Sequence, residues 1–135
     1  MKYVYPALFS KEGDSILVSV PDLPGTHTFG SDIADALFMA EDAVAMWLWD
    51  AENNKETIPK ASAKSDIEKQ CKGKGQFVNL VAADTEEYRR QNDSRAIRKT
   101  LSIPAWLNHK AERANAPFSQ ILQQGLKDYL HITDA

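Results

Sequence analysis

The stretch Arg98-Lys99-Thr100-Leu101-Ser102-Ile103-Pro104 decides how the C-terminal part of this 135-residue chain folds. Its residues alternate between polar and apolar types, so a strand here would have two different faces. The polar face would carry Arg98, Thr100 and Ser102, and the apolar face Leu101 and Ile103. Pro104 ends such a strand, and because proline fits the first turn of a helix, it also starts the next element.

Two helices are predicted after this strand. The first runs to about Asn115, a residue that tolerates the left-handed conformation of a helix end, and Ala116-Pro117 prevents its continuation. Ser119 stands where an N-cap belongs. Apolar residues then recur at helical spacing, at Ile121, Leu122, Gly125, Leu126 and Tyr129. One strand and two one-sided helices leave a sheet edge unpaired, so we expect the segment to be stable only as a dimer.

This order of elements resembles a ribbon-helix-helix DNA-binding domain. The resemblance implies that two antiparallel strands form a ribbon that enters the major groove. The candidate DNA-binding residues are Arg95, Arg98, Thr100, Ser102 and Ser119, the last through nearby N–H groups that would hold a phosphate. The expected dimer core consists of Leu101, Ile103, Ile121, Leu122 and Leu126. A helical hairpin with a solvated basic edge is the alternative.

The first part of the chain predicts a small antiparallel or mixed sheet. Strands are expected over residues 3–9, 16–20, 26–29 and 76–82. Pro21-Asp22-Leu23-Pro24-Gly25 is a rigid turn, and Pro6 belongs on a sheet edge or at a bulge. Because the apolar residues of 76–82 are nearly continuous, we expect this last strand at the centre of the sheet.

One helix dominates this part, from about Ile33 to Asp50, with Ser31 or Asp32 as its cap. The side predicted to pack on the sheet carries Ile33, Leu37, Ala40, Val44, Trp47 and Leu48. A second apolar stripe lies roughly opposite and consists of Phe38, Ala45 and Trp49, interrupted by Asp42 and flanked by Met39 and Met46. A helix that is apolar on two sides is either buried twice or presents a binding surface, and we favour a protein interface.

Charge and composition divide the chain in two. Residues 1–60 are predominantly acidic, whereas residues from Arg89 to Arg113 are predominantly basic. The two parts should therefore have different partners. Alternatively, the acidic residues serve only to keep the protein in solution. Residues 53–75 predict a long loop or a short helix, and 84–92 a short helix. Gln91-Asn92-Asp93-Ser94 has the composition of a hinge. We therefore expect domains over residues 1–90 and 95–135.

Four stretches carry a resemblance to the HicB antitoxin family. They are Tyr5-Pro6-Ala7-Leu8-Phe9, Val18-Ser19-Val20-Pro21-Asp22-Leu23-Pro24-Gly25, Gly30 with Asp35-Ala36-Leu37, and Ile58-Pro59-Lys60-Ala61-Ser62. The resemblance spans residues 1–83, and the tail matches members that carry a ribbon-helix-helix domain. It implies an α+β fold with a reduced RNase H-like domain that covers HicA, a small basic RNA-cleaving toxin, while the tail represses the shared operon. The candidate toxin-binding residues are Asp22, His27, Phe38, Asp42 and Trp49.

The implied partners are a HicA-like toxin, operator DNA and a second copy of the chain, with higher oligomers left open. A second class of function also stays open, namely a ribbon-helix-helix transcriptional regulator whose N-terminal domain binds a ligand or drives oligomerisation, with no toxin. The single cysteine, Cys71, excludes an internal disulfide, and no N-terminal stretch resembles a signal peptide or a membrane span. We expect a cytoplasmic protein that does not bind membranes.

Enzymatic functions find little support in the sequence. The three histidines lie too far apart in sequence to suggest a metal site. Asp14, Asp22 and Asp35 would be the carboxylates for nuclease chemistry in an RNase H-like fold. That chemistry needs carboxylates that converge from strand centres, whereas these lie in predicted turns or near a helix start. We therefore expect no enzyme activity, no metal and no cofactor.

Overall fold

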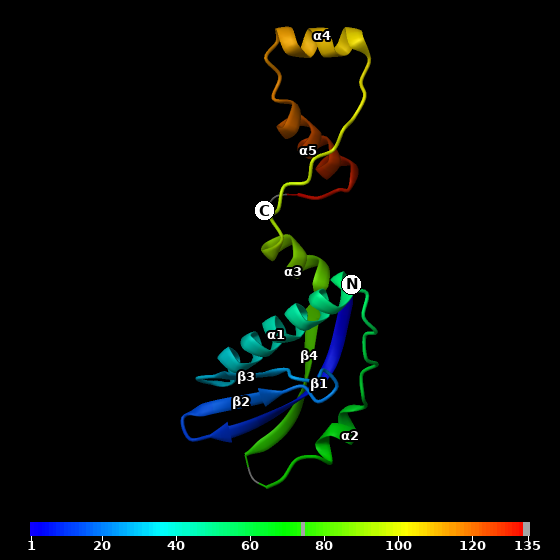
Figure 1. The fold of residues 1–135 in the computed structure, drawn as a ribbon. Helices are drawn as coiled ribbons and strands as arrows, with labels where there is room; N and C mark the ends of the chain where they lie inside the picture. Colours follow the sequence, from blue (N-terminus) through cyan, green and yellow to red (C-terminus); the bar gives the residue numbers. More distant parts are fainter. Residues whose placement is uncertain (74, 134–135) are drawn as a thin grey trace. The chain divides into compact units, whose positions relative to one another are not determined.

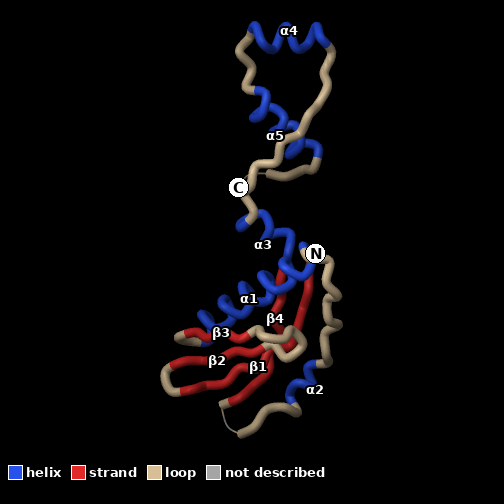
Figure 2. The backbone as a smooth tube through the Cα atoms, viewed as in Figure 1, coloured by secondary structure: helices blue, strands red, loops and turns tan. Residues whose placement is uncertain are grey.

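The computed structural model describes residues 1–73 and 75–133 and separates the chain into two compact units, Met1–Arg95 and Ala96–Ala135 (Figure 1). Within the described residues, unit 1 contains a four-stranded antiparallel sheet with helices packed on it, which confirms the predicted α+β class. The strands are β1 (Lys2–Glu12), β2 (Ser15–Ser19), β3 (His27–Gly30) and β4 (Gln76–Asp84), in the order β3-β2-β1-β4 (Figure 2).

Helix α1 (Ile33–Asn53) covers one face of this sheet. The predicted cap is confirmed at Asp32, whose Oδ1 accepts a hydrogen bond from Asp35 N at 2.7 Å. The helix buries mainly small residues, namely Ala36, Ala40, Val44, Ala45, Leu48 and Ala51. Gly30 at the end of β3 lies so close to α1 that a Cβ on it would be 2.3 Å from Ala36 N. Helix and sheet therefore meet here without a side chain between them.

The side of α1 predicted to pack on the sheet is correct except at its first residue. Leu37 and Trp47 are half-buried against the core, but Ile33 is 53% exposed. The core begins one turn later, at Ala36 opposite Gly30, so the first turn of the helix lies beyond it.

β4 lies at an edge of the sheet, so the prediction of a central strand is wrong. Val81 and Ala83 lie in the core shared with α1, and Val78 is buried on the other face of the strand. α2 (Lys64–Glu68) also contacts β4. Leu80, however, is 50% exposed and Ala82 is exposed, so this nearly continuous apolar run does not mark a strand buried on both faces.

Pro6 lies in β1, one of the two inner strands, yet it keeps the position that its chemistry requires. β2 pairs only with Leu8–Glu12, while β4 pairs with Lys2–Ser10. Pro6 therefore has a neighbouring strand on one side only, and its missing N–H costs no ladder hydrogen bond on the other. The expectation of an edge position for Pro6 is confirmed locally.

Unit 2 contains helices α4 (Ala105–Arg113) and α5 (Phe118–Tyr129). Asn115 in the turn between them has a φ of 53°, as predicted for a residue that tolerates the left-handed region. Residues 98–103 form no strand within the single chain, since a strand is defined by a ladder to a neighbour. The predicted ribbon stays a prediction.

The prediction that Ser119 caps the second of these helices is wrong. α5 begins at Phe118, directly after Pro117, and no side-chain cap hydrogen bond forms. Proline lacks an N–H and holds φ near its helical value, so the helix starts immediately behind it and Ser119 lies inside the first turn. Pro104 likewise precedes α4 as its N-cap residue, one position earlier than expected.

No described residue of unit 2 is buried in the single chain. The five residues predicted for the dimer core are between 40% and 61% exposed: Leu101, Ile103, Ile121, Leu122 and Leu126. Two short helices with solvated apolar sides lack the buried area that a stable unit needs. Across the described residues, no helix combines the length and apolar character needed to cross a membrane.

Candidate functional site

A groove of about 220 Å³ lies between α1, β4 and α3 (Thr85–Asn92) in unit 1. Its apolar lining comes from Phe38, Ala45, Ala82, Ala83 and the ring of Tyr88. Among the described residues that line it, every charged one is a carboxylate, namely Glu41, Asp42, Asp84 and Glu87. We call this feature the acidic groove. It combines an apolar floor with negative charge on its walls.

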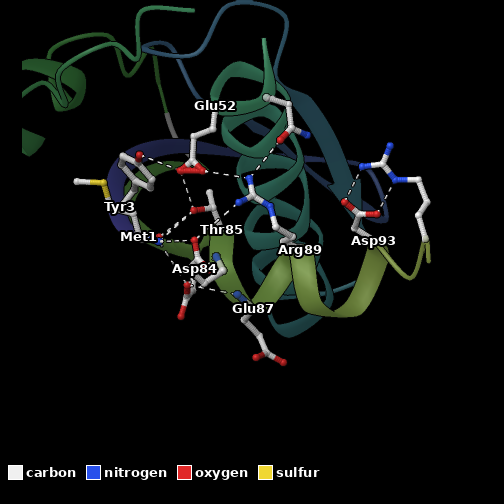
Figure 3. A network of polar contacts seen from close by, with 11 residues as sticks. Met1, Tyr3, Glu52, Asp84, Thr85, Glu87, Arg89 and Asp93 are labelled. Carbon is white, nitrogen blue, oxygen red and sulfur yellow. Dashed lines mark hydrogen bonds and ion pairs between the residues drawn. The ribbon is translucent and has the colours of Figure 1, made fainter. Parts of the chain in front are cut away.

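Packing against α1 fixes the position of α3, which forms one wall of the acidic groove. The rings of Trp49 and Tyr88 lie 5.3 Å apart between centroids. Thr85 is fully buried, and its Oγ1 donates a hydrogen bond to Glu52 Oε1 at 2.8 Å (Figure 3). Arg89 adds a hydrogen bond from its guanidinium to Asn53 Oδ1 at 3.2 Å. The α3 wall is therefore preformed in the single chain.

Asp84, which lines the acidic groove, also has a structural role. It caps α3, because its Oδ1 accepts hydrogen bonds from Glu86 N at 3.0 Å and Glu87 N at 3.4 Å. Partial burial, and then the charge of Asp42, raise the pKa of the Tyr88 hydroxyl above its ordinary value.

A second hollow, of about 470 Å³, lies between α1 and the turn before β3. It is lined by Gly25, Thr26, His27, Ala43, Met46, Trp47, Trp49 and Asp50. Trp47 Nε1 donates a hydrogen bond to Pro24 O at 3.2 Å and so ties the turn to the helix. Thr26 Oγ1 and Trp49 Nε1 are buried polar atoms for which the described residues offer no partner.

The structure divides the five residues predicted to bind a toxin among three places. Phe38 and Asp42 line the acidic groove, and His27 lines the second hollow. Trp49 joins the two, since it lines the second hollow and packs on Tyr88. Asp22 belongs to neither place, because its carboxylate accepts hydrogen bonds from Ser62 N at 2.8 Å and Ser62 Oγ at 2.5 Å.

Sequence reasoning missed seven residues that line the acidic groove, namely Glu41, Ala82, Ala83, Asp84, Glu87, Tyr88 and Gln91. Glu41 had a detectable signal, since it follows Phe38 by three positions on a helix and therefore shares its side. The α3 residues had none, because only the packing of α3 on α1 brings them to this place. Over residues 1–73 and 75–133, no group of three or more His, Cys, Asp or Glu side chains is placed to hold a metal ion.

The residues predicted to bind DNA lie in different local settings. Arg98, Thr100 and Ser102 are exposed in a segment without regular structure. Arg95 instead pairs with Asp93, with Nε to Oδ1 at 2.8 Å and a terminal nitrogen to Oδ2 at 3.0 Å, and this hydrogen bonding lowers the pKa of the Asp93 carboxyl. Ser119 lies in the first turn of α5.

Comparison with known proteins gives consistent results over nearly the whole chain. The family described as "HicB_like antitoxin of bacterial toxin-antitoxin system" matches residues 5–126. An uncharacterized 14.9 kDa protein from the rep-hol intergenic region of Haemophilus phage HP1 is 26% identical over 110 residues, which cover 82% of this chain and 80% of that protein.

Among the similar solved structures are two that cover nearly the whole chain. A chain of a toxin–antitoxin complex from Streptococcus pneumoniae is 25% identical with a TM-score of 0.59, covering 96% of this chain and 99% of that one. The Burkholderia pseudomallei antitoxin HicB shares the fold at 24% identity, with a TM-score of 0.52 and coverage of 99% of both chains.

Proposed function

This chain belongs to the family of HicB-like antitoxins of bacterial toxin–antitoxin systems, and we propose that it binds and inhibits a small basic, mRNA-cleaving toxin similar to HicA. The observation that carries the proposal is the extent of the family match, which includes most of both units. The similar S. pneumoniae chain comes from a toxin–antitoxin complex, which supports a toxin as the partner. We expect unit 1 to bind this toxin because it has a core of its own.

We further propose that unit 2 is a dimeric ribbon-helix-helix domain through which the chain represses its own operon. The basic residues around Arg98 attract phosphate, and an alternating strand over residues 98–103 would direct its polar face to base edges. The exposed apolar sides of α4 and α5 call for a second copy to cover them. For unit 1, a sheet covered by α1 on one face is compatible with a reduced RNase H-like fold.

The second hollow favours another candidate function, a ribbon-helix-helix regulator whose unit 1 binds a small ligand and no toxin. Its volume of about 470 Å³ falls within the common range for ligand pockets, roughly 300–1,000 Å³. Thr26 Oγ1 and Trp49 Nε1 would supply unused hydrogen-bonding groups near such a ligand. The toxin-binding function also accounts for the match to an antitoxin family, so we rank the ligand-binding regulator second.

Co-expression of the full chain with the product of the adjacent open reading frame tests the first proposal. The full chain should rescue growth and co-purify with that product as a stoichiometric complex. A folded full chain that neither rescues growth nor binds the product would refute the toxin-binding function and leave the ligand-binding regulator. Operator DNA should bind the full chain with a steep dependence on salt, because phosphate contacts release counterions.

A further inference from the structure

We propose that the acidic groove is where the protein partner of unit 1 docks, and that the partner inserts an apolar side chain flanked by lysine or arginine residues. The inference rests on the proposed function, under which these residues belong to the toxin. It goes further because it selects the acidic groove over the second hollow and states the chemistry of the partner segment that occupies the groove.

The rim of the acidic groove exposes an aromatic ring that the single chain leaves uncovered. Phe38 is 67% exposed, on a helix whose buried side carries Ala36, Ala40 and other small residues. Aromatic residues are enriched at the centres of protein interfaces, where covering them contributes much of the affinity. Phe38 is therefore the apolar anchor point that the partner is expected to cover.

The negative charge of the acidic groove favours a partner segment that carries positive charge. Within the described residues, the carboxylates of Glu41 and Asp42 form no side-chain hydrogen bond or ion pair, so both keep their charge available. Glu87 is partly engaged, with Arg90 at 3.8 Å and with Gln91, whose Nε2 donates to Glu87 Oε1 at 2.9 Å. Carboxylates gathered around an apolar floor repel one another, and a bound basic segment would relieve that repulsion. The same opposite charges would also increase the rate of association.

The size of the acidic groove decides between a protein segment and a small molecule. About 220 Å³ lies below the usual range for small-ligand pockets, roughly 300–1,000 Å³. That space suits one or two side chains projecting from a larger surface. Because Tyr88 is held by Trp49, and Asp84 by its role as a cap, the groove needs little rearrangement to accept them.

Binding of full-length variants to the immobilised product of the adjacent open reading frame tests the proposal. Exchanging both free carboxylates for lysine, as Glu41→Lys with Asp42→Lys, should raise Kd at least about thirtyfold and remove most of its dependence on salt. Phe38→Ala should raise Kd at least about tenfold, whereas Phe38→Tyr should retain binding.

Matched controls lie outside the acidic groove. Glu12→Lys with Asp14→Lys makes the same change of charge at the exposed end of β1 and the turn that follows it, and Met46→Ala removes an exposed apolar side chain from the second hollow. Both should leave Kd within about twofold. All altered residues are exposed, so far-ultraviolet circular dichroism should match that of the parent chain.

The outcomes separate this proposal from the function on which it rests. If the parent chain fails to bind, the proposed function itself is wrong. If the parent binds but folded groove variants bind equally well, docking occurs elsewhere and only the groove assignment fails. Weakened binding in Met46→Ala alone would move the site to the second hollow. A changed sedimentation coefficient of the groove variants without partner would indicate a second copy in the groove and would also overturn the proposal.

Discussion

Replacing Leu122 with aspartate should separate the proposed dimer. Leu122 lies on the apolar side of α5 and is 40% exposed in the single chain, so a second copy has surface left to cover. In the dimer, Leu122→Asp would place two carboxylates, one from each copy, in the shared core with no cation opposite them. Both copies lose apolar burial and both must bury an uncompensated charge.

The size of this effect follows from the exposure of Leu122. Fully burying a leucine contributes about 1.5–3 kcal/mol, so covering the exposed 40% contributes about 0.6–1.2 kcal/mol per copy. An unpaired buried charge costs about 3–5 kcal/mol, of which partial hydration of the carboxylate removes a part. For two copies a loss of about 6 kcal/mol is a cautious sum. It corresponds to a dimer dissociation constant raised about 10⁴-fold.

Sedimentation equilibrium over a wide range of concentrations measures that constant. The matched control is Gln123→Asp, which adds the same carboxylate to the polar side of α5 and should leave the dimer intact. A Leu122→Asp chain that sediments as a dimer with an unchanged dissociation constant would refute the shared core. Loss of helical signal from α4 and α5 should accompany dissociation, since neither helix buries a residue within the single chain.

Three further outcomes are expected. Arg98→Ala should weaken operator binding by about 1–3 kcal/mol and relax base preference in a fluorescence anisotropy titration, and unchanged affinity would remove Arg98 from the interface. Gly30→Ala should lower the free energy of unfolding in urea by about 3 kcal/mol, because the new Cβ would lie 2.3 Å from Ala36 N. The control Gly13→Ala should lower it by only about 1 kcal/mol, because its Cβ meets no atom and only the φ of 58° is strained. Burial and then Asp22 raise the pKa of Tyr5 above 10.0 in the folded state, so its contribution to stability is complete below pH 10 and is lost as the pH rises through the folded pKa. Tyr5→Phe should therefore reduce the loss of stability at alkaline pH. Near neutral pH the same change should lower the free energy of unfolding by about 1 kcal/mol, because the hydrogen bond to Pro59 O is lost. An unchanged alkaline profile of stability would contradict this role.

Features set by neighbouring residues could be predicted from the sequence. Asp32 caps α1 through a residue three positions away, and Asn115 takes its left-handed conformation within one turn. The order of strands and helices in unit 1 followed from similar local patterns. Ser119 failed because two local signals competed: the proline before it determined where α5 begins, and a cap preference worth about 1 kcal/mol did not override that constraint.

Features set by packing could not be predicted. The apolar run 76–82 predicted a central strand buried on both faces, yet Leu80 within it is 50% exposed and the strand lies at the edge of the sheet. The acidic groove also depends on packing, because α1 and α3 meet only through contacts such as Trp49 with Tyr88. No periodicity along either helix reports that meeting. The helical stripe of Phe38 and Asp42 was visible in the sequence, whereas its opposite wall was not.

The contrast in burial between the two units has a consequence for how each binds its partner. Unit 1 buries a core around Phe9, Leu48 and Val81 within a single chain, so binding at its surface needs no second copy. The described part of unit 2 buries nothing alone, so under the proposed function the formation of the dimer and of its DNA-binding surface would be one equilibrium. Operator binding should therefore depend steeply on the concentration of the chain. Binding of the protein partner by unit 1 should follow a simple one-site dependence at the same concentrations.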